Sequence, residues 1–186
     1  MSEITADLVK QLRDKTGISI MQCRKALEET LGDLDKAVLL LQERSKDIAL
    51  KRGDRTLGSG AISSYIHSNG GIGAMVELLC ETDFVSNNEE FKALARDIAM
   101  HITATNPKFL KLEDITEAAR ASALESIKAE GGGEDSLDSY LKERVLLEQS
   151  FIKDAEVTIQ DLIERAIQKF GEHMELSRFT RYSVSQ

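Results

Sequence analysis

The fold class of this chain follows from one stretch of its sequence, residues 61–81, which reads AISSYIHSNGGIGAMVELLCE. Two strand-like runs, Ala61–His67 and Ile72–Glu81, flank the sequence SNGG at 68–71, which is typical of a hairpin turn. In the second run, alternate residues share one apolar face. Because Met75 makes the opposite face apolar as well, we expect this strand to be covered on both sides.

A third strand is predicted near the C-terminal end, where side chains of Met174–Val184 alternate between two faces. Its pairing with the hairpin predicts a three-stranded antiparallel sheet with helices on one side, an α+β fold. Helical periodicity fills the intervening sequence. Helices are expected from Ser86, whose spacing to Glu89 fits a capping box, to about residue 106, and over 113–129, 137–147 and 158–170.

Three shorter helices are predicted before the hairpin. They begin near Ile4, Ser19 and Asp33, are separated by Gly17 and Gly32, and together form a three-helix bundle. The basic stretch 44–58 is interpreted as a helical extension that runs into a linker. The sequence therefore predicts a helical domain with its basic extension over residues 1–54 and an α+β core domain over residues 55–186.

Composition limits the possible functions. The chain has 24 Lys and Arg residues against 32 Asp and Glu residues, which gives a net charge of −8. This charge disfavours a protein whose whole surface binds nucleic acid. The N-terminus lacks the pattern of a signal peptide, no apolar run approaches a membrane span, and two cysteines do not make a disulfide scaffold. We therefore expect a cytoplasmic protein without a membrane partner.

Motifs for bond-making chemistry are not found in the sequence. A glycine-rich phosphate loop of the G-x-x-x-x-G-K-[ST] type is missing, so direct nucleotide binding is not expected. The three histidines lack metal-ligand spacing, and acidic neighbours disfavour a reactive thiolate at Cys80. The expected protein is not an enzyme, and no cofactor or metal is expected.

The sequence Thr82-Asp83-Phe84-Val85 stands out, because it joins the end of a strand to the start of a helix. Loops carried on rigid elements often hold binding residues. Phe84 has two interpretations. It is either a core plug, a buried side chain that fills the gap between strand and helix, or an exposed aromatic side chain that binds a partner. Asp83 either satisfies nearby backbone N–H groups or contacts a cation of a partner. Spacing alone leaves both alternatives open.

Four sequence motifs carry a family resemblance. They are LVKQLRDKTG at 8–17 followed by MQCRKAL at 21–27, VELLCETDFV at 76–85, VLLEQSF at 145–151 and RFTRY at 178–182. Together they make the chain similar, over nearly its whole length, to the bacterial elongation factor Ts family, the guanine-nucleotide exchange factors of elongation factor Tu.

The resemblance implies that the N-terminal bundle is ubiquitin-associated-like. It also implies that the chain binds GDP-bound and nucleotide-free elongation factor Tu and promotes GDP release. In the family, the Asp-Phe pair of the motif at Thr82, Asp83, Phe84 and Val85 contacts the GTPase domain, where the phenylalanine disturbs the magnesium and phosphate site. Further implied contacts to that domain are Arg13, Ile20, Met21 and Arg24, and His67 is implied to meet the third domain of the partner.

The resemblance also implies a homodimer. Family members commonly have two sheet-bearing halves, whereas this chain has one, and short members are thought to pair, so we expect a dimer through the terminal sheet. Three residues depart from the family pattern. Thr180 stands where some short relatives have a cysteine, Ser150 replaces a usual proline, and Ile20 replaces a usual methionine.

Two other function classes are compatible with the residues. One is a non-catalytic protein-interaction module of the translation machinery, since helical bundles of this kind often bind peptides. The other is an RNA-binding accessory factor that uses the basic residues of 44–55.

Overall fold

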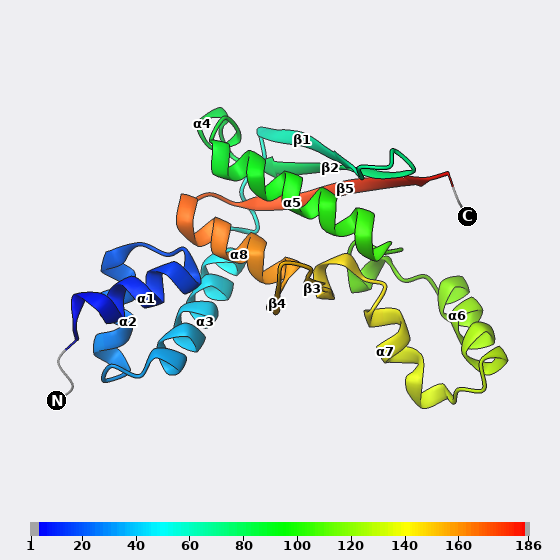
Figure 1. Ribbon diagram of the computed structural model, residues 1–186, viewed down its shortest axis with the longest axis horizontal. Helices are drawn as coiled ribbons and strands as arrows, with labels where there is room; N and C mark the ends of the chain where they lie inside the picture. The colour runs from blue at the N-terminus through cyan, green and yellow to red at the C-terminus, as the bar shows by residue number, and fades with distance from the viewer. Residues whose placement is uncertain (1–3, 185–186) are drawn as a thin grey trace. The chain divides into compact units, whose positions relative to one another are not determined.

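A computed structural model describes residues 4–184 of the chain (Figure 1). The chain divides into two compact units, each built from three separate stretches. The first contains residues up to 60 together with 79–88 and 161–175, and the second contains 61–78, 89–160 and the residues from 176 onward. The division into domains at residues 54 and 55 stays a prediction.

Three helices open the first unit, as predicted. They are α1 (Ala6–Thr16), α2 (Ile20–Glu29) and α3 (Leu34–Arg52), and each packs on the other two. Their shared core consists of the buried residues Val9, Leu12, Ile18, Cys23, Ala26, Leu27, Ala37 and Leu41. The three-helix bundle is thus confirmed, while its ubiquitin-associated-like character stays a prediction.

Ser19 and Asp33 cap their helices where the sequence predicts helix starts, and Thr5, which was not among the predicted caps, caps α1. The hydroxyls of Thr5 and Ser19 accept hydrogen bonds from the backbone N–H groups of residues 8 and 22, and the Asp33 carboxylate accepts one from residue 36. Gly17 ends α1 with a φ of 69°, in the left-handed region that favours glycine. These local bonds satisfy N–H groups that have no partner within the helix.

Helix α3 continues through the basic stretch, which confirms the predicted helical extension. Its 19 residues reach Arg52, and the following segment leaves the helix. Helix α8 (Ile159–Phe170) provides a partner for the extension within the first unit. There, the buried Ser45 hydroxyl hydrogen-bonds Gln168, and Lys46 lies 3.9 Å from Asp161.

The three-stranded antiparallel sheet lies mainly in the second unit and is confirmed. Its strands are β1 (Ser59–Ile66), β2 (Ile72–Cys80) and β5 (Met174–Ser183), in the order β1-β2-β5. The predicted turn at 68–71 joins the first two, with the His67 N–H donating to the Ile72 carbonyl over 2.8 Å. The C-terminal strand therefore pairs with β2 at the centre of the sheet.

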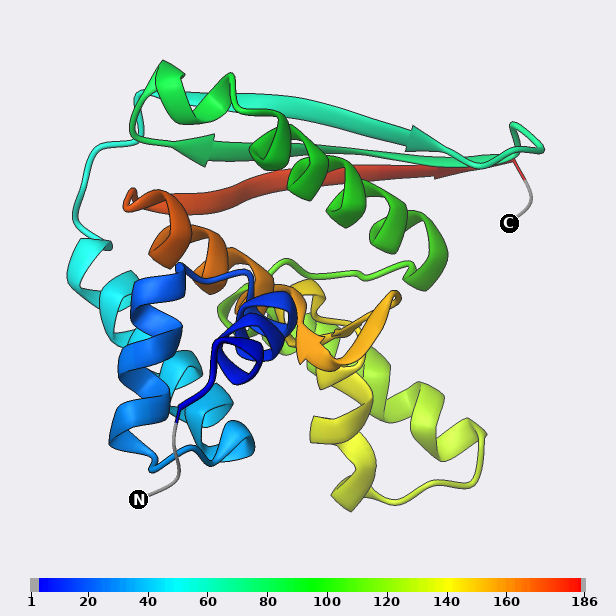
Figure 2. The same ribbon diagram turned by 60° about the vertical axis from the view of Figure 1, so that its left-hand side comes forward.

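Helix α5 (Glu89–Thr105) covers one face of the sheet (Figure 2). Ala74, Val76 and Leu78 of β2 are buried, as are many apolar residues of α5. The opposite face is open, since Met75 is 47% exposed, so the expectation that β2 is covered on both sides was wrong. An apolar side chain on a strand does not by itself require that this face be buried.

Shorter elements complete the second unit. They are the helices α6 (Glu117–Ala129) and α7 (Leu137–Lys142), the 3₁₀ turns η1 (Leu112–Asp114), η2 (Glu134–Ser136) and η3 (Leu146–Glu148), and the hairpin of β3 (Ser150–Phe151) and β4 (Asp154–Thr158). Helix α6 begins later than predicted because the Thr116 hydroxyl caps it by accepting from Ala119 N–H over 3.2 Å. The β3–β4 hairpin was missed, and its first strand β3 has only two residues, which is too short to show the alternation of a strand.

A buried histidine on α5 is a titratable group in the core of the second unit. His101 is fully buried, its Nε2 lies 2.9 Å from Gln149 Oε1, and its Nδ1 has no hydrogen-bond partner among residues 4–184. Burial lowers the pKa of His101 below its ordinary value of 6.5, although the bond to Gln149 opposes this change. Between the lowered value and 6.5, only the unfolded chain takes up the proton.

We therefore expect the free energy of unfolding to fall as the pH falls below about 6.5. Denaturant titrations at pH 7.5 and 5.5 measure this change, and the variant His101→Gln should show a smaller difference between the two pH values. His67→Gln, which alters an exposed histidine, is the control and should keep the wild-type difference. Equal differences in wild type and His101→Gln would show that another group is responsible.

Candidate partner-binding surfaces

A sharp corner follows the end of β2 in the first unit. The residues Asp83–Ser86 form the single-turn helix α4, and Thr82 precedes it in extended conformation. Phe84 is 82% exposed at this corner, whereas its neighbour Val85 is 2% exposed. The core-plug interpretation of Phe84 is therefore wrong, because Val85 fills that role and leaves the aromatic ring in solvent.

The helix predicted to begin at Ser86 begins instead at Glu89. The Ser86 hydroxyl does not cap α5. It donates to the Asp83 carbonyl over 3.2 Å and lies 2.8 Å from the hydroxyl of Ser59. The capping-box spacing was misleading here. Ser86 is the last residue of the short helix α4, and a serine three residues before a glutamate gives the same sequence pattern whether it ends one helix or begins the next.

Two carboxylates lie at the base of this corner. The Glu172 carboxylate accepts hydrogen bonds from the Thr82 N–H over 3.0 Å and from the Thr82 hydroxyl over 2.5 Å. The Glu81 carboxylate accepts from Arg55 Nη1 over 3.1 Å and from the His173 N–H over 2.5 Å. The hydrogen bond from His173 and the charge and hydrogen bond of Arg55 hold the pKa of Glu81 below its ordinary value.

Both cysteines are buried and free, as the sequence predicts for structural thiols. Burial is the main cause that raises the pKa of Cys80, and the charges of Glu172 and Glu81 raise it further. Its Sγ donates a hydrogen bond to the Thr82 carbonyl over 3.2 Å. Cys80 thus stabilises the backbone of the corner and has the wrong environment for a reactive thiolate.

A second surface of the first unit lies between α1 and α2. A cavity of about 470 Å³ is lined there by Arg13, Ile20 and Arg24, together with Ile4, Ala6, Val9, Lys10 and Asp14. Met21 lies next to Ile20 on α2 and is 80% exposed. The structure therefore brings together three of the four N-terminal candidates, Arg13, Ile20 and Arg24, at one cavity that combines apolar and cationic groups, whereas Met21 does not line it.

His67 belongs to a different unit from the other candidate residues. It lies in the second unit at the hairpin end of β1, where its side chain is exposed. Its Nδ1 lies 3.5 Å from the Tyr65 hydroxyl. An exposed imidazole at a hairpin is accessible to a partner, but this geometry does not identify one.

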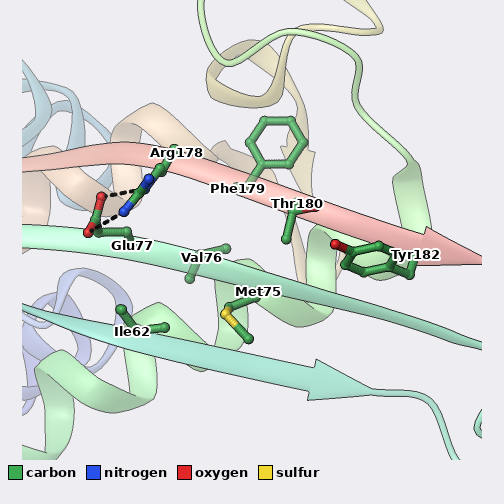
Figure 3. A pocket seen from close by; sticks show the side chains of 8 residues that line it. All are labelled: Ile62, Met75, Val76, Glu77, Arg178, Phe179, Thr180 and Tyr182. Carbon is green, nitrogen blue, oxygen red and sulfur yellow. Dashed lines mark hydrogen bonds and ion pairs between the residues drawn. The ribbon is translucent and has the colours of Figure 1, made fainter.

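The open face of the sheet is a third surface, and sequence reasoning named none of its residues as contacts. Its exposed apolar side chains are Ile62, Ile66, Met75, Tyr182 and Val184. A groove of about 310 Å³ lies on this face, and Figure 3 shows the side chains that line it, with Ile62 near one end, Met75 near the middle and Tyr182 near the other end. The sequence feature that could have indicated this surface is the alternation of apolar and small residues in β1.

An ion pair crosses this open face. Arg178 Nε lies 2.9 Å from Glu77 Oε2, and the two side chains belong to adjacent strands (Figure 3). The hydrogen bond from Arg178 is the main cause that lowers the pKa of Glu77. The face therefore combines apolar side chains with one acidic and one basic group.

Within residues 4–184, no cluster of three or more His, Cys, Asp or Glu side chains is arranged to hold a metal ion. In the same range, no helix combines the length and apolar character that a membrane span requires.

Comparisons with known proteins agree with the motifs. Residues 3–186 match the family model described as Elongation factor TS. Elongation factor Ts of Desulforamulus reducens is 42% identical over 198 residues, which cover 100% of this chain and 91% of the relative. Those of Thermodesulfovibrio yellowstonii and Thermosipho melanesiensis are 43% and 42% identical, and each alignment covers 98% of this chain and 97% or 100% of the relative.

These matches place the chain among the nucleotide exchange factors of translation. The chain belongs to the elongation factor Ts family.

Proposed function

We propose that this protein is the guanine-nucleotide exchange factor of elongation factor Tu and that it acts in the cytoplasm. The observation that carries the proposal is the 82% exposure of Phe84 beside the buried Val85. An aromatic ring held in solvent on a fixed backbone is suited to enter a pocket of a partner, where buried aromatic side chains dominate binding energy. Asp83 precedes the ring on the same short helix.

Exchange in this proposal needs no bond-making step by the protein. It binds elongation factor Tu more tightly in the nucleotide-free state than in the GDP-bound state, so by linkage GDP binds the complex more weakly. Phe84 enters the GTPase domain and disturbs the magnesium and phosphate site, while Asp83 contacts the same domain. The protein speeds GDP release and leaves the final balance of GDP and GTP unchanged.

The remaining contacts are distributed over other surfaces. Arg13, Ile20, Met21 and Arg24 contact the GTPase domain, and His67 contacts the third domain of elongation factor Tu. The cavity between α1 and α2 supports this assignment, because Ile20 lines it together with the cationic side chains of Arg13 and Arg24. In this proposal residues 1–54, with a ubiquitin-associated-like bundle, form the N-terminal domain, and residues 55–186 form the core and dimerisation domain.

We also propose that the chain forms a homodimer through the open face of the sheet. The five exposed apolar side chains of this face favour burial against a second copy. A two-fold interface brings the same surface from both chains together. The Glu77–Arg178 pair supports self-pairing, because each copy offers both a negative and a positive group to the other.

Stopped-flow measurement of GDP release tests the exchange proposal. Elongation factor Tu loaded with a fluorescent GDP analogue is mixed with excess unlabelled GDP, with and without this protein. We expect the release rate to rise with the concentration of the protein and to reach a plateau. Binding to elongation factor Tu with an unchanged release rate would instead indicate the alternative, a non-catalytic interaction module of the translation machinery.

A further inference from the structure

Two segments of the first unit, 90 residues apart in sequence, exchange hydrogen bonds at the base of the corner. The carboxylate of Glu81 accepts from the backbone N–H of His173, and the carboxylate of Glu172 accepts from the backbone N–H of Thr82. Each segment thus supplies one carboxylate and one backbone donor to the other. We call this reciprocal pair of Glu81 with His173 and Glu172 with Thr82 the carboxylate clasp.

The clasp has the features of a strong interaction. Hydrogen bonds between backbone N–H groups and ionised carboxylates are shorter and stronger than neutral ones. Glu172 receives a second bond from the Thr82 hydroxyl, so both of its oxygens are used. Glu81 also binds Arg55 with both oxygens, at 3.1 and 3.2 Å, and only 19% of its side chain is exposed.

The position of Thr82 gives the clasp its importance for Phe84. Thr82 immediately precedes α4, and its hydroxyl donates to Glu172 instead of capping that helix. Helix α4 has four residues, too few to be stable through its own hydrogen bonds. Buried Val85 and Ser86 hold one end of this turn, and the clasp holds the other.

The turn that carries the second carboxylate is also fixed. Helix α8 ends at Phe170, and Gly171 follows with a φ of 75°, which favours glycine. The chain reverses there and enters β5 at Met174, so Glu172 and His173 are the residues of the connection that face the corner.

We propose that Glu81 and Glu172 are positioning residues that hold Phe84 in the orientation needed to enter elongation factor Tu, an inference that rests on the exchange function proposed above. Neither carboxylate needs to touch the partner. Without the clasp, Thr82 loses two hydrogen bonds and α4 samples several orientations. A ring that is correctly oriented only part of the time inserts less often, so release slows although Phe84 is still present.

The variants Glu172→Ala, Glu172→Gln and Thr82→Val test the clasp. Glu172→Gln keeps an acceptor oxygen, and Thr82→Val preserves the shape of the side chain but removes the hydroxyl, so both should have intermediate effects. Glu175→Ala is the matched control, since it removes an exposed carboxylate three residues away on β5. The thermal unfolding midpoint of every variant is measured alongside to establish that each is folded.

Hydrogen–deuterium exchange of the free protein is the first measurement. Glu172→Ala should speed exchange of the hydrogen-bonded amides of Thr82 and Ser86 by roughly tenfold, as expected when a hydrogen-bonded turn opens locally. Glu175→Ala should leave these amides unchanged. Wild-type protection of the two amides in folded Glu172→Ala would overturn the clasp, and this result requires no partner.

GDP release from elongation factor Tu is the second measurement. Glu172→Ala should lower the stimulated release rate roughly five- to tenfold, with partial recovery in Glu172→Gln, since small errors of position slow a process that needs a fixed orientation. Wild-type stimulation by Glu172→Ala would overturn the positioning role and leave the exchange function intact. If the wild-type protein itself fails to speed release, the exchange function fails, and with it the role of the clasp in exchange.

Discussion

Replacing Phe84 by alanine is expected to lower the stimulated rate of GDP release from elongation factor Tu by about 30-fold or more. Loss of a central aromatic contact in an interface removes about 2 kcal/mol or more of binding energy, which corresponds to at least that factor. The fold should not suffer, because the ring is 82% exposed and its removal leaves no cavity in the core. Stopped-flow fluorescence of labelled GDP measures the rate.

Two further variants make this result specific. Leu50→Ala removes an 80% exposed apolar side chain from the same unit and should behave as wild type. Val85→Ala shortens a 2% exposed side chain beside Phe84 and should lower the unfolding temperature, which Phe84→Ala should not do. A Phe84→Ala protein that releases GDP at the wild-type rate would contradict the insertion of this ring.

Introducing carboxylates into the open face of the sheet is expected to convert the proposed dimer into single chains. Met75 lies on the central strand and Ile62 on its neighbour, so the double variant Ile62→Asp, Met75→Asp places four charges in a two-fold interface. Burying unpaired charges is strongly unfavourable. Sedimentation should give twice the chain mass of 20.6 kDa for the wild type and the single-chain mass for the variant.

The controls for this prediction separate charge from position. Leu31→Asp adds a carboxylate at a 75% exposed leucine of the first unit and should remain dimeric. Met75→Leu keeps the apolar character of the central strand and should remain dimeric as well. A wild-type protein that sediments as a single 20.6 kDa species at micromolar concentration would refute the dimer.

Much of the fold was predictable because its signals act over a few residues. The capping side chains of Ser19 and Asp33, which were predicted, bind N–H groups three residues further on, so this signal is local in the sequence. The hairpin turn and the alternation in β2 are equally local. This approach failed for the shortest elements, since β3 has two residues and α4 has four, too few to show a period.

The candidate site was predictable in part. The motif at residues 82–85 identified the corner, but its sequence left open whether Phe84 is buried. Tertiary packing decided this, because Val85 is the side chain that turns inward and Phe84 the one that turns out. The sequence also left open whether the second face of β2 is covered, since Met75 is apolar in either case. The structure shows that Met75 is exposed.

By itself, the sequence determined the order of the long helices and strands, the α+β class and the location of the exposed corner. Only the tertiary structure decided which side chains of the corner are exposed and which distant residues support it. The physical reason is the range of the interactions. Caps, turns and periodicity depend on neighbours within about four residues. Glu172 reaches Thr82 across 90 residues of sequence, a contact that exists only after segments 79–88 and 161–175 have packed into the same unit.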